Sequence, residues 1–156
     1  MTDGLAARDH RLMKAAIDQA RLGAEEGGVP IGAALAVADE VLAVGRNRRV
    51  QLGSAIRHGE TDALEAAGRQ PASLYARATI YTTLSPCDMC AGAILLYGIP
   101  RVVVAENRTF LGAEDLLRSR GVQVVVAESE ECVQLMEAFI REHAALWNED
   151  IGVESP

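Results

Sequence analysis

The sequence of 156 residues predicts a single α/β domain, a three-layer α/β/α sandwich in which helices cover both faces of a five-stranded mixed sheet. Its length fits one domain of about 150 residues, and residues 1–156 contain no linker long enough to separate two domains. In the second half, apolar runs of strand length alternate with segments of helical periodicity, which is typical of parallel strands joined by helices. In the first half, two apolar runs follow each other directly, which favours an antiparallel hairpin.

The first half of the chain is predicted to contain a helix, a hairpin, a loop and a second helix. Apolar residues recur at helical spacing over about Arg8–Glu26, until two glycines and a proline end the helix. Strands are predicted at Ile31–Val37 and Val41–Val44, with a short turn between them. The polar segment Gly45–Arg57 predicts a loop, and a helix is expected over about His58–Ala67.

Strands and helices alternate through the second half, so we expect its three strands to be parallel. The last predicted helix carries an apolar stripe that includes Cys132, which is typical of a helix packed on a sheet. The predicted elements are strands at Thr79–Leu84, Arg101–Ala105 and Val122–Ala127, and helices at Cys87–Tyr97, Glu114–Arg120 and Ser129–Leu146.

Composition and charge disfavour several classes of partner. With 15 basic and 22 acidic residues, the net charge of −7 argues against a general electrostatic grip on nucleic acid or on an anionic membrane. The longest apolar stretches fall well below the roughly 18 to 20 residues of a membrane span, and the N-terminal residues lack the apolar core of a secretory signal. The three cysteines are too few for a disulfide scaffold, so we expect a cytoplasmic protein that binds neither nucleic acid nor membrane.

Two of the cysteines form a Cys-x-x-Cys pair at the predicted start of a helix. Ser85 is suited to cap this helix, and Pro86 is suited to its first position. Cys87 and Cys90 then project from one side of the first turn, where the helix dipole favours the thiolate form. On this spacing alone, the pair fits either a metal site or a thioredoxin-type redox site.

A second motif, His58-Gly59-Glu60, adds a metal ligand and an acid. Together the two motifs resemble the signature of zinc-dependent base deaminases, H-x-E followed by P-C-x-x-C, in which the glutamate is not a ligand. The ligands His58, Cys87 and Cys90 would leave the fourth position of a tetrahedral Zn²⁺ open. Glu60 would then shuttle protons in a hydrolytic deamination.

The non-enzyme alternative is a structural zinc site or a redox module. A structural zinc site needs a fourth protein ligand, and the remaining candidates fit badly. Cys132 is predicted to be buried in packing, whereas His10 and His143 lie on flanking helices and are expected to be solvated. The three-ligand catalytic site is therefore favoured.

Several stretches beyond the metal motifs are shared with one family of enzymes. They include Tyr97-Gly98-Ile99-Pro100-Arg101 and the tail 147–152, and the match extends from about residue 20 to residue 151. Through these stretches the chain resembles the fungal-type cytosine deaminases of the zinc-dependent cytidine and deoxycytidylate deaminase superfamily. The resemblance implies a cytidine deaminase-like fold, one Zn²⁺ per subunit, a homodimer, and conversion of free cytosine to uracil and ammonia in pyrimidine salvage.

The resemblance also implies a set of residues around the base. Asn47 and the Gly59 N–H would bind the carbonyl edge of the ring, and Asp150 would lie near the exocyclic amine. Two aromatic residues would close over the base and three further residues would complete the wall, namely Phe110, Trp147, Ile31, Leu84 and Ser85. From the sequence alone, Asn47 also fits a turn residue, the two aromatics fit core positions, and Asp150 fits a solvated tail.

One residue close to the motif departs from the family pattern. Asp62 adds a negative charge one turn from the expected metal, where it would either alter the pocket or cap the helix. This departure keeps other small amino-substituted rings open as substrates, namely isocytosine, creatinine, an aminotriazine and guanine. A more distant alternative is tRNA adenosine deamination, for which the nearby Arg46, Arg48, Arg49 and Arg57 would contact phosphates, although the net charge favours a solvated loop.

Overall fold

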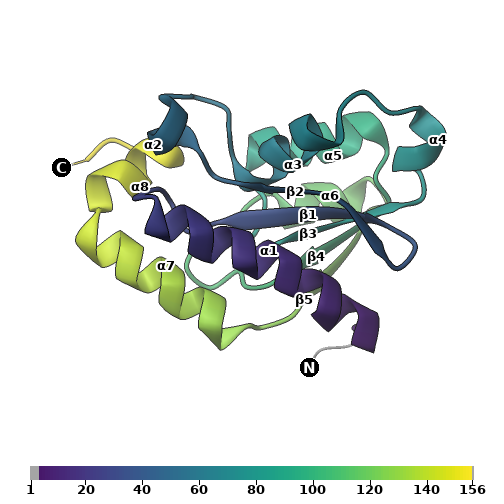
Figure 1. The fold of residues 1–156 in the computed structure, drawn as a ribbon, viewed down its shortest axis with the longest axis horizontal. Helices are drawn as coiled ribbons and strands as arrows, with labels where there is room; N and C mark the ends of the chain where they lie inside the picture. Colours follow the sequence, from purple (N-terminus) through teal and green to yellow (C-terminus); the bar gives the residue numbers. More distant parts are fainter. Residues whose placement is uncertain (1–3, 156) are drawn as a thin grey trace.

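The computed structural model describes residues 4–155, so the first three residues of the N-terminal segment and residue 156 lie outside the description (Figure 1). One sheet contains the strands β1 (Gly32–Val37), β2 (Glu40–Arg46), β3 (Ala78–Thr82), β4 (Arg101–Val104) and β5 (Gln123–Val126). Their order across the sheet is β2-β1-β3-β4-β5. β1 is antiparallel to β2 and to β3, whereas β3, β4 and β5 are mutually parallel, which confirms the predicted mixed sheet.

Helices cover both faces of this sheet. They are α1 (Ala7–Glu25), α2 (Arg49–Leu52), α3 (Gly59–Ala67), α4 (Ala72–Tyr75), α5 (Asp88–Tyr97), α6 (Glu114–Ser119), α7 (Glu130–Glu142) and α8 (Ala144–Asp150). α1 and α7 pack on one face, and α3, α5 and α6 pack on the other, which confirms the three layers (Figure 1). Within residues 4–155, none of these helices has both the length and the apolar composition that crossing a membrane requires.

The central strands supply both cores because their side chains alternate between the two faces. Ile80 and Val102 belong to the apolar core under α5 and α6. Their neighbours Tyr81 and Val103 belong to the core under α1 and α7. A period of two along each strand thus gives each helical layer its own apolar surface. This explains why β4 is apolar at every position after Arg101.

Gly45 in β2 brings α3 into direct contact with the sheet. A Cβ atom built at this position would fall 2.2 Å from the backbone nitrogen of Ala63, which is closer than the two atoms can approach. Only a glycine therefore lets the backbones of β2 and α3 lie this close. The contact fixes the helix that begins directly after His58.

Three parts of the fold differ from the sequence prediction. The predicted loop at 45–57 contains the single turn of α2, and α4 forms before β3 in a segment to which no element was assigned. The predicted long last helix is broken at His143, where φ is −137° and ψ is 50°. The apolar periodicity continues across this residue and so gave no sign of the break. As a result, Trp147 and Phe139 both join an apolar cluster with Leu84 beside the end of the sheet.

A buried ion pair joins the start of α1 to the sheet. Asp9 accepts hydrogen bonds from Tyr81 Oη at 2.6 Å, from Arg101 Nη1 at 2.8 Å and from the Ala6 backbone N–H at 2.8 Å. Burial alone raises the pKa of Asp9, but these hydrogen bonds and the Arg101 charge outweigh it. They hold the pKa of Asp9 well below its usual value of 3.8.

Replacing Asp9 with asparagine is expected to lower the free energy of unfolding by about 3 kcal/mol at neutral pH, because Arg101 loses its buried partner. Since the pKa of Asp9 is lower in the folded chain, its stabilisation is complete above the unfolded value and is lost as the pH falls toward the folded value. Urea unfolding at about pH 7 and about pH 3 tests this. The difference between wild type and Asp9→Asn should shrink at the lower pH, and an equal difference at both would contradict the assignment.

Candidate active site

The two sequence motifs meet where α3 and α5 begin, beside the carboxyl end of β3. His58 is the N-cap residue of α3, so the first turn places Glu60 directly after it. Cys87 is the N-cap residue of α5, and Cys90 follows within the first turn. Two helix starts therefore present all four side chains to one small volume.

The predicted cap of α5 was wrong. Ser85 lies before the helix, and the chain stays extended as far as Cys87, whose ψ is 175°. The Ser85 hydroxyl instead donates to Glu114 Oε2 at 2.6 Å and accepts from the Gly112 N–H at 2.9 Å. It therefore fastens the loop before α6 to the wall of the site.

The three predicted ligands have the geometry of a tetrahedral metal site. His58 Nδ1 lies 3.4 Å from Cys87 Sγ and 3.7 Å from Cys90 Sγ. All three donor atoms lie within 4.8 Å of one another. Tetrahedral Zn²⁺, with Zn–N near 2.0 Å and Zn–S near 2.3 Å, places nitrogen and sulfur about 3.5 Å apart. One imidazole and two sulfurs at these distances fit zinc.

The predicted non-ligands lie elsewhere in the described chain. Cys132 is buried in α7, within the apolar core under α1. His10 and His143 are exposed, as expected. The fourth zinc position is therefore left to a non-protein ligand, as in a catalytic site.

Hydrogen bonds at the start of α5 favour a thiolate. The side chain and the backbone amide of Cys90, together with His58, lower the pKa of Cys87 to about 4, against the opposing effect of burial. The pKa of Cys90 is raised well above 9.0, first because its thiol donates to Cys87 and second because it is buried. Cys87 is therefore the more acidic of the two thiols.

Glu60 has the environment of a proton carrier. Its side chain is buried, with a residue exposure of 4%. Burial raises the pKa of Glu60 to about 7, although the nearby His58 opposes the shift. A carboxyl group with a pKa near neutrality can both accept and release a proton under physiological conditions.

Asp150 and Asn47 form a polar wall behind the imidazole. Asp150 Oδ1 lies 3.2 Å from His58 Nε2, and its other oxygen accepts from Asn47 Nδ2 at 2.7 Å. Asn47 is fully buried, and its own carbonyl oxygen accepts from the Arg49 N–H at 3.1 Å. Asp150 thus orients the ring of His58 so that Nδ1 faces the cysteines. The sequence gave no sign of this contact.

A small, partly open cavity adjoins the ligands. Phe110 and Trp147 close it with an edge-to-face contact, in which the ring centroids are 5.8 Å apart. Asn47 and Gly59 are not among the lining residues, although each neighbours one that is. The lining residues are Ile31, His58, Glu60, Leu84, Ser85, Cys87, Phe110, Trp147, Asp150 and Ile151. Of these, Ile151 was not predicted, and its place after Asp150 was the only available signal.

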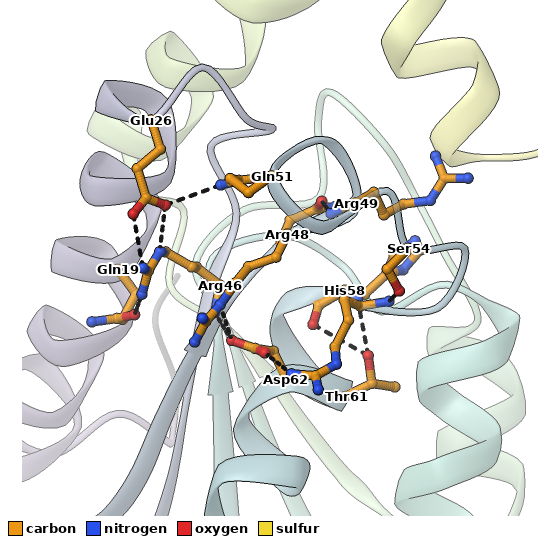
Figure 2. A network of polar contacts seen from close by, with 12 residues as sticks. Gln19, Glu26, Arg46, Arg48, Arg49, Gln51, Ser54, His58, Thr61 and Asp62 are labelled. Carbon is orange, nitrogen blue, oxygen red and sulfur yellow. Dashed lines mark hydrogen bonds and ion pairs between the residues drawn. The ribbon is translucent and has the colours of Figure 1, made fainter.

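The four arginines near the site are paired with carboxylates of the same chain, as Figure 2 shows for those around α3. Arg46 binds Glu26 at 2.8 Å, and Arg49 lies 3.6 Å from Glu149. Arg48 and Arg57 both bind Asp62, at 3.0 Å and 2.7 Å. The arginines of the loop that was expected to be solvated therefore form ion pairs within the chain. Asp62 neither lines the cavity nor caps α3, where the His58 N–H donates to Thr61 Oγ1 instead.

Comparison with known proteins identifies deaminases that are similar to this chain in sequence and in structure. A cytosine deaminase from Candida albicans is 54% identical over 145 residues, which cover 92% of this chain and 97% of the relative. A tRNA-specific adenosine deaminase from Bacillus subtilis is 32% identical over 145 residues, covering 86% of this chain and 90% of that one. A solved chain from work on A-to-I editing by tRNA:A34 deaminases has a TM-score of 0.66 at 28% identity, covering 77% of this chain and 99% of that one.

The family profile of the cytidine and deoxycytidylate deaminase zinc-binding region matches residues 6–106. This range contains β1 to β4 and all three members of the ligand cluster. The site is accordingly a zinc-binding site, in agreement with the distances between the donor atoms. Because the profile, the relatives and the site geometry agree, the chain belongs to the family of zinc-binding cytidine and deoxycytidylate deaminases.

Proposed function

We propose that this chain is a zinc-dependent cytosine deaminase, which converts free cytosine and water to uracil and ammonia. The cavity that brings Glu60 together with the zinc ligands His58 and Cys87 carries this proposal. Its lining places the acid and two zinc ligands beside two aromatic side chains, Phe110 and Trp147, an arrangement that suits a small planar ring. The Candida albicans relative, a cytosine deaminase, supports the same substrate.

His58 Nδ1, Cys87 Sγ and Cys90 Sγ would hold the zinc ion. When bound there, zinc would supply a Lewis acid that makes water easier to ionise near neutral pH. Glu60 accepts the proton of the attacking water and delivers it to N3 of the ring. Glu60 then takes the second proton from the hydroxyl group on C4 and gives it to the departing amine as the bond from C4 to nitrogen breaks. C4 becomes a carbonyl, ammonia leaves, and the carboxylate is restored at the end of the cycle.

The remaining residues orient the base and exclude bulk water. The Asn47 amide and the Gly59 N–H bind the carbonyl edge of the ring, and Asp150 accepts from the exocyclic amine. Phe110 and Trp147 cover the base, together with the wall residues Ile31, Leu84 and Ser85. Asp150 touches both His58 and Asn47, so it couples the position of the zinc ligand to that of the substrate.

Ammonia release from a panel of substrates tests the proposal. The panel contains cytosine, isocytosine, creatinine, an aminotriazine, guanine and a tRNA with adenosine at the wobble position. We expect kcat/KM for cytosine to exceed that for any other member by about 100-fold or more, because a ring with the wrong polar edge leaves buried groups unpaired. Faster turnover of another ring would reassign the substrate, and turnover of tRNA would contradict the free-base proposal.

We further propose that the enzyme is a homodimer, which the family resemblance implies. Apolar side chains are exposed along α5, with Met89 at 36% and Leu96 at 76% exposure, seven positions apart on one side of the helix. Leu111 is 66% exposed beside the outer mouth of the site, so the apolar surface continues to the catalytic cavity. A second copy of the chain covering this surface explains the exposure.

Light scattering after gel filtration is expected to give twice the mass of the chain. Replacing Leu96 with glutamate should convert the protein to monomers, because a charge would be buried without a partner in the proposed interface. The exposed Leu22 on α1 provides a matched control, since Leu22→Glu places the same charge on the opposite layer. A monomeric wild type would contradict the dimer.

We also infer one cytidine deaminase-like domain in the cytoplasm. The described elements, from α1 to α8, are arranged around a single sheet. The three cysteines are free thiols, and the two in the zinc site need to stay reduced to bind the metal.

A further inference from the structure

One buried carboxylate, that of Asp62, holds together three segments around the site (Figure 2). Its residue exposure is 1%. Asp62 Oδ2 accepts from the Arg46 backbone N–H and from Arg48 Nε, both at 3.0 Å. Asp62 Oδ1 accepts from Arg57 Nη1 at 2.7 Å. The proposed mechanism uses none of these groups.

These donors are sequence neighbours of residues in the proposed site. Arg46 and Arg48 lie on either side of Asn47, which is at the end of β2. Arg57 immediately precedes His58, and Asp62 itself stands two residues after Glu60 on α3. The carboxylate therefore connects both neighbours of the proposed base-binding asparagine to the helix that carries the catalytic acid.

We propose that Asp62 is a positioning residue that fixes Asn47 relative to His58 and Glu60, and so sets the affinity for the base. This inference rests on the proposed function, in which the Asn47 amide binds the ring. Asp62 does not line the cavity and is not a zinc ligand, although its backbone N–H donates to the His58 carbonyl oxygen at 2.9 Å within α3. Its carboxylate also holds Arg57, and its effect on base binding is expected to pass through the segment 46–48, which contains Asn47.

The physical basis is that three donors depend on one acceptor group. Without the carboxylate, the Arg46 N–H loses its partner, and two guanidinium groups face each other without a counter-charge. The segment 46–48 must then move to regain hydrogen bonds, and Asn47 moves with it. A binding group displaced by about 0.5 Å already leaves its productive geometry. Glu26 does not replace Asp62, because it binds the side chains of Arg46 and Gln51 and not the backbone of the segment 46–48.

A double-mutant cycle tests this role. We expect Asp62→Asn to raise KM for cytosine about 10-fold, while kcat changes less than about threefold and zinc content is unchanged. In an Asn47→Ala background, the same change should alter kcat/KM by less than about twofold, because the side chain that Asp62 positions is already absent. Glu26→Gln is the matched control, since it removes the other carboxylate of the Arg46 network and should leave KM within about twofold.

Equal fold-changes in the two backgrounds would overturn the proposal, because Asp62 would then act independently of Asn47. A lower kcat with an unchanged KM would also overturn it. If Asp62→Asn does not fold, Arg48→Gln removes one of the three donors from a partly exposed position. It is expected to raise KM about threefold in the wild-type background and not in Asn47→Ala.

Hydrogen exchange gives a readout that does not depend on the substrate. The amides of residues 46–48 should exchange at least about 10-fold faster in Asp62→Asn than in the wild type, whereas those of α1 should not change. If cytosine is not turned over, the proposed function fails while this measurement still decides whether Asp62 holds the segment. Unchanged exchange at 46–48 would overturn the positioning role.

Discussion

Replacing Glu60 with glutamine is expected to lower kcat for cytosine by about 10²- to 10⁴-fold, the usual contribution of a positioned acid–base group. Glutamine has nearly the same shape and fits the same buried site. It cannot accept the proton of the attacking water or return it to N3 and to the leaving amine. The loss should therefore fall on kcat, with a smaller change in KM.

Zinc content and thermal unfolding show whether the Glu60→Gln protein is intact. Both should match the wild type, because Glu60 is not one of the three clustered ligands. Glu65 offers a matched control on the same helix, since it is exposed and Glu65→Gln makes the same chemical change away from the cavity. If Glu60→Gln kept full activity, the catalytic proposal would fail, and a structural zinc site would become the better explanation.

The parts of the site that the sequence could predict depend on residues a few positions apart. Cys87 and Cys90 are three positions apart, and His58 and Glu60 are two apart, so one helix start brings each pair together. The strands and helices could also be predicted from local patterns, because apolar runs of strand length alternate along the chain with segments of helical periodicity. These signals were sufficient for the mixed sheet and for the ligand cluster.

The contacts that the sequence could not predict join distant segments. Asn47 and Asp150 are 103 positions apart, and their hydrogen bond depends on the break before α8. Serine is a common helix-cap residue. The Ser85 hydroxyl, however, donates its hydrogen bond to Glu114, 29 positions later, and does not cap α5. Likewise, Asp62 forms its ion pairs with arginines only because β2 and α3 pack together. In each case, tertiary contacts outweigh a local preference.

Removing a zinc ligand is the second substitution that is expected to reduce activity strongly. Cys90→Ala leaves only an imidazole and one thiolate, so the site should no longer retain zinc through dialysis. Deamination of cytosine should fall by at least about 10³-fold, because the Lewis acid that activates water is lost. The temperature of unfolding should also fall, since zinc binds the folded site and stabilises it by mass action.

Cys132→Ala separates these effects from the simple loss of a buried thiol. Cys132 is 1% exposed and Cys90 is 0% exposed, so both substitutions remove a sulfur from a buried position. Only Cys90 belongs to the ligand cluster. Cys132→Ala should therefore keep one zinc per chain and nearly full activity, with a modest stability loss from the cavity. Chelation of the wild type should reproduce the inactivity of Cys90→Ala, and added zinc should restore only the wild type. Purified wild type without a transition metal, and without recovery on adding one, would contradict the zinc mechanism, because the remaining groups at the site have no means of activating water for attack on the ring.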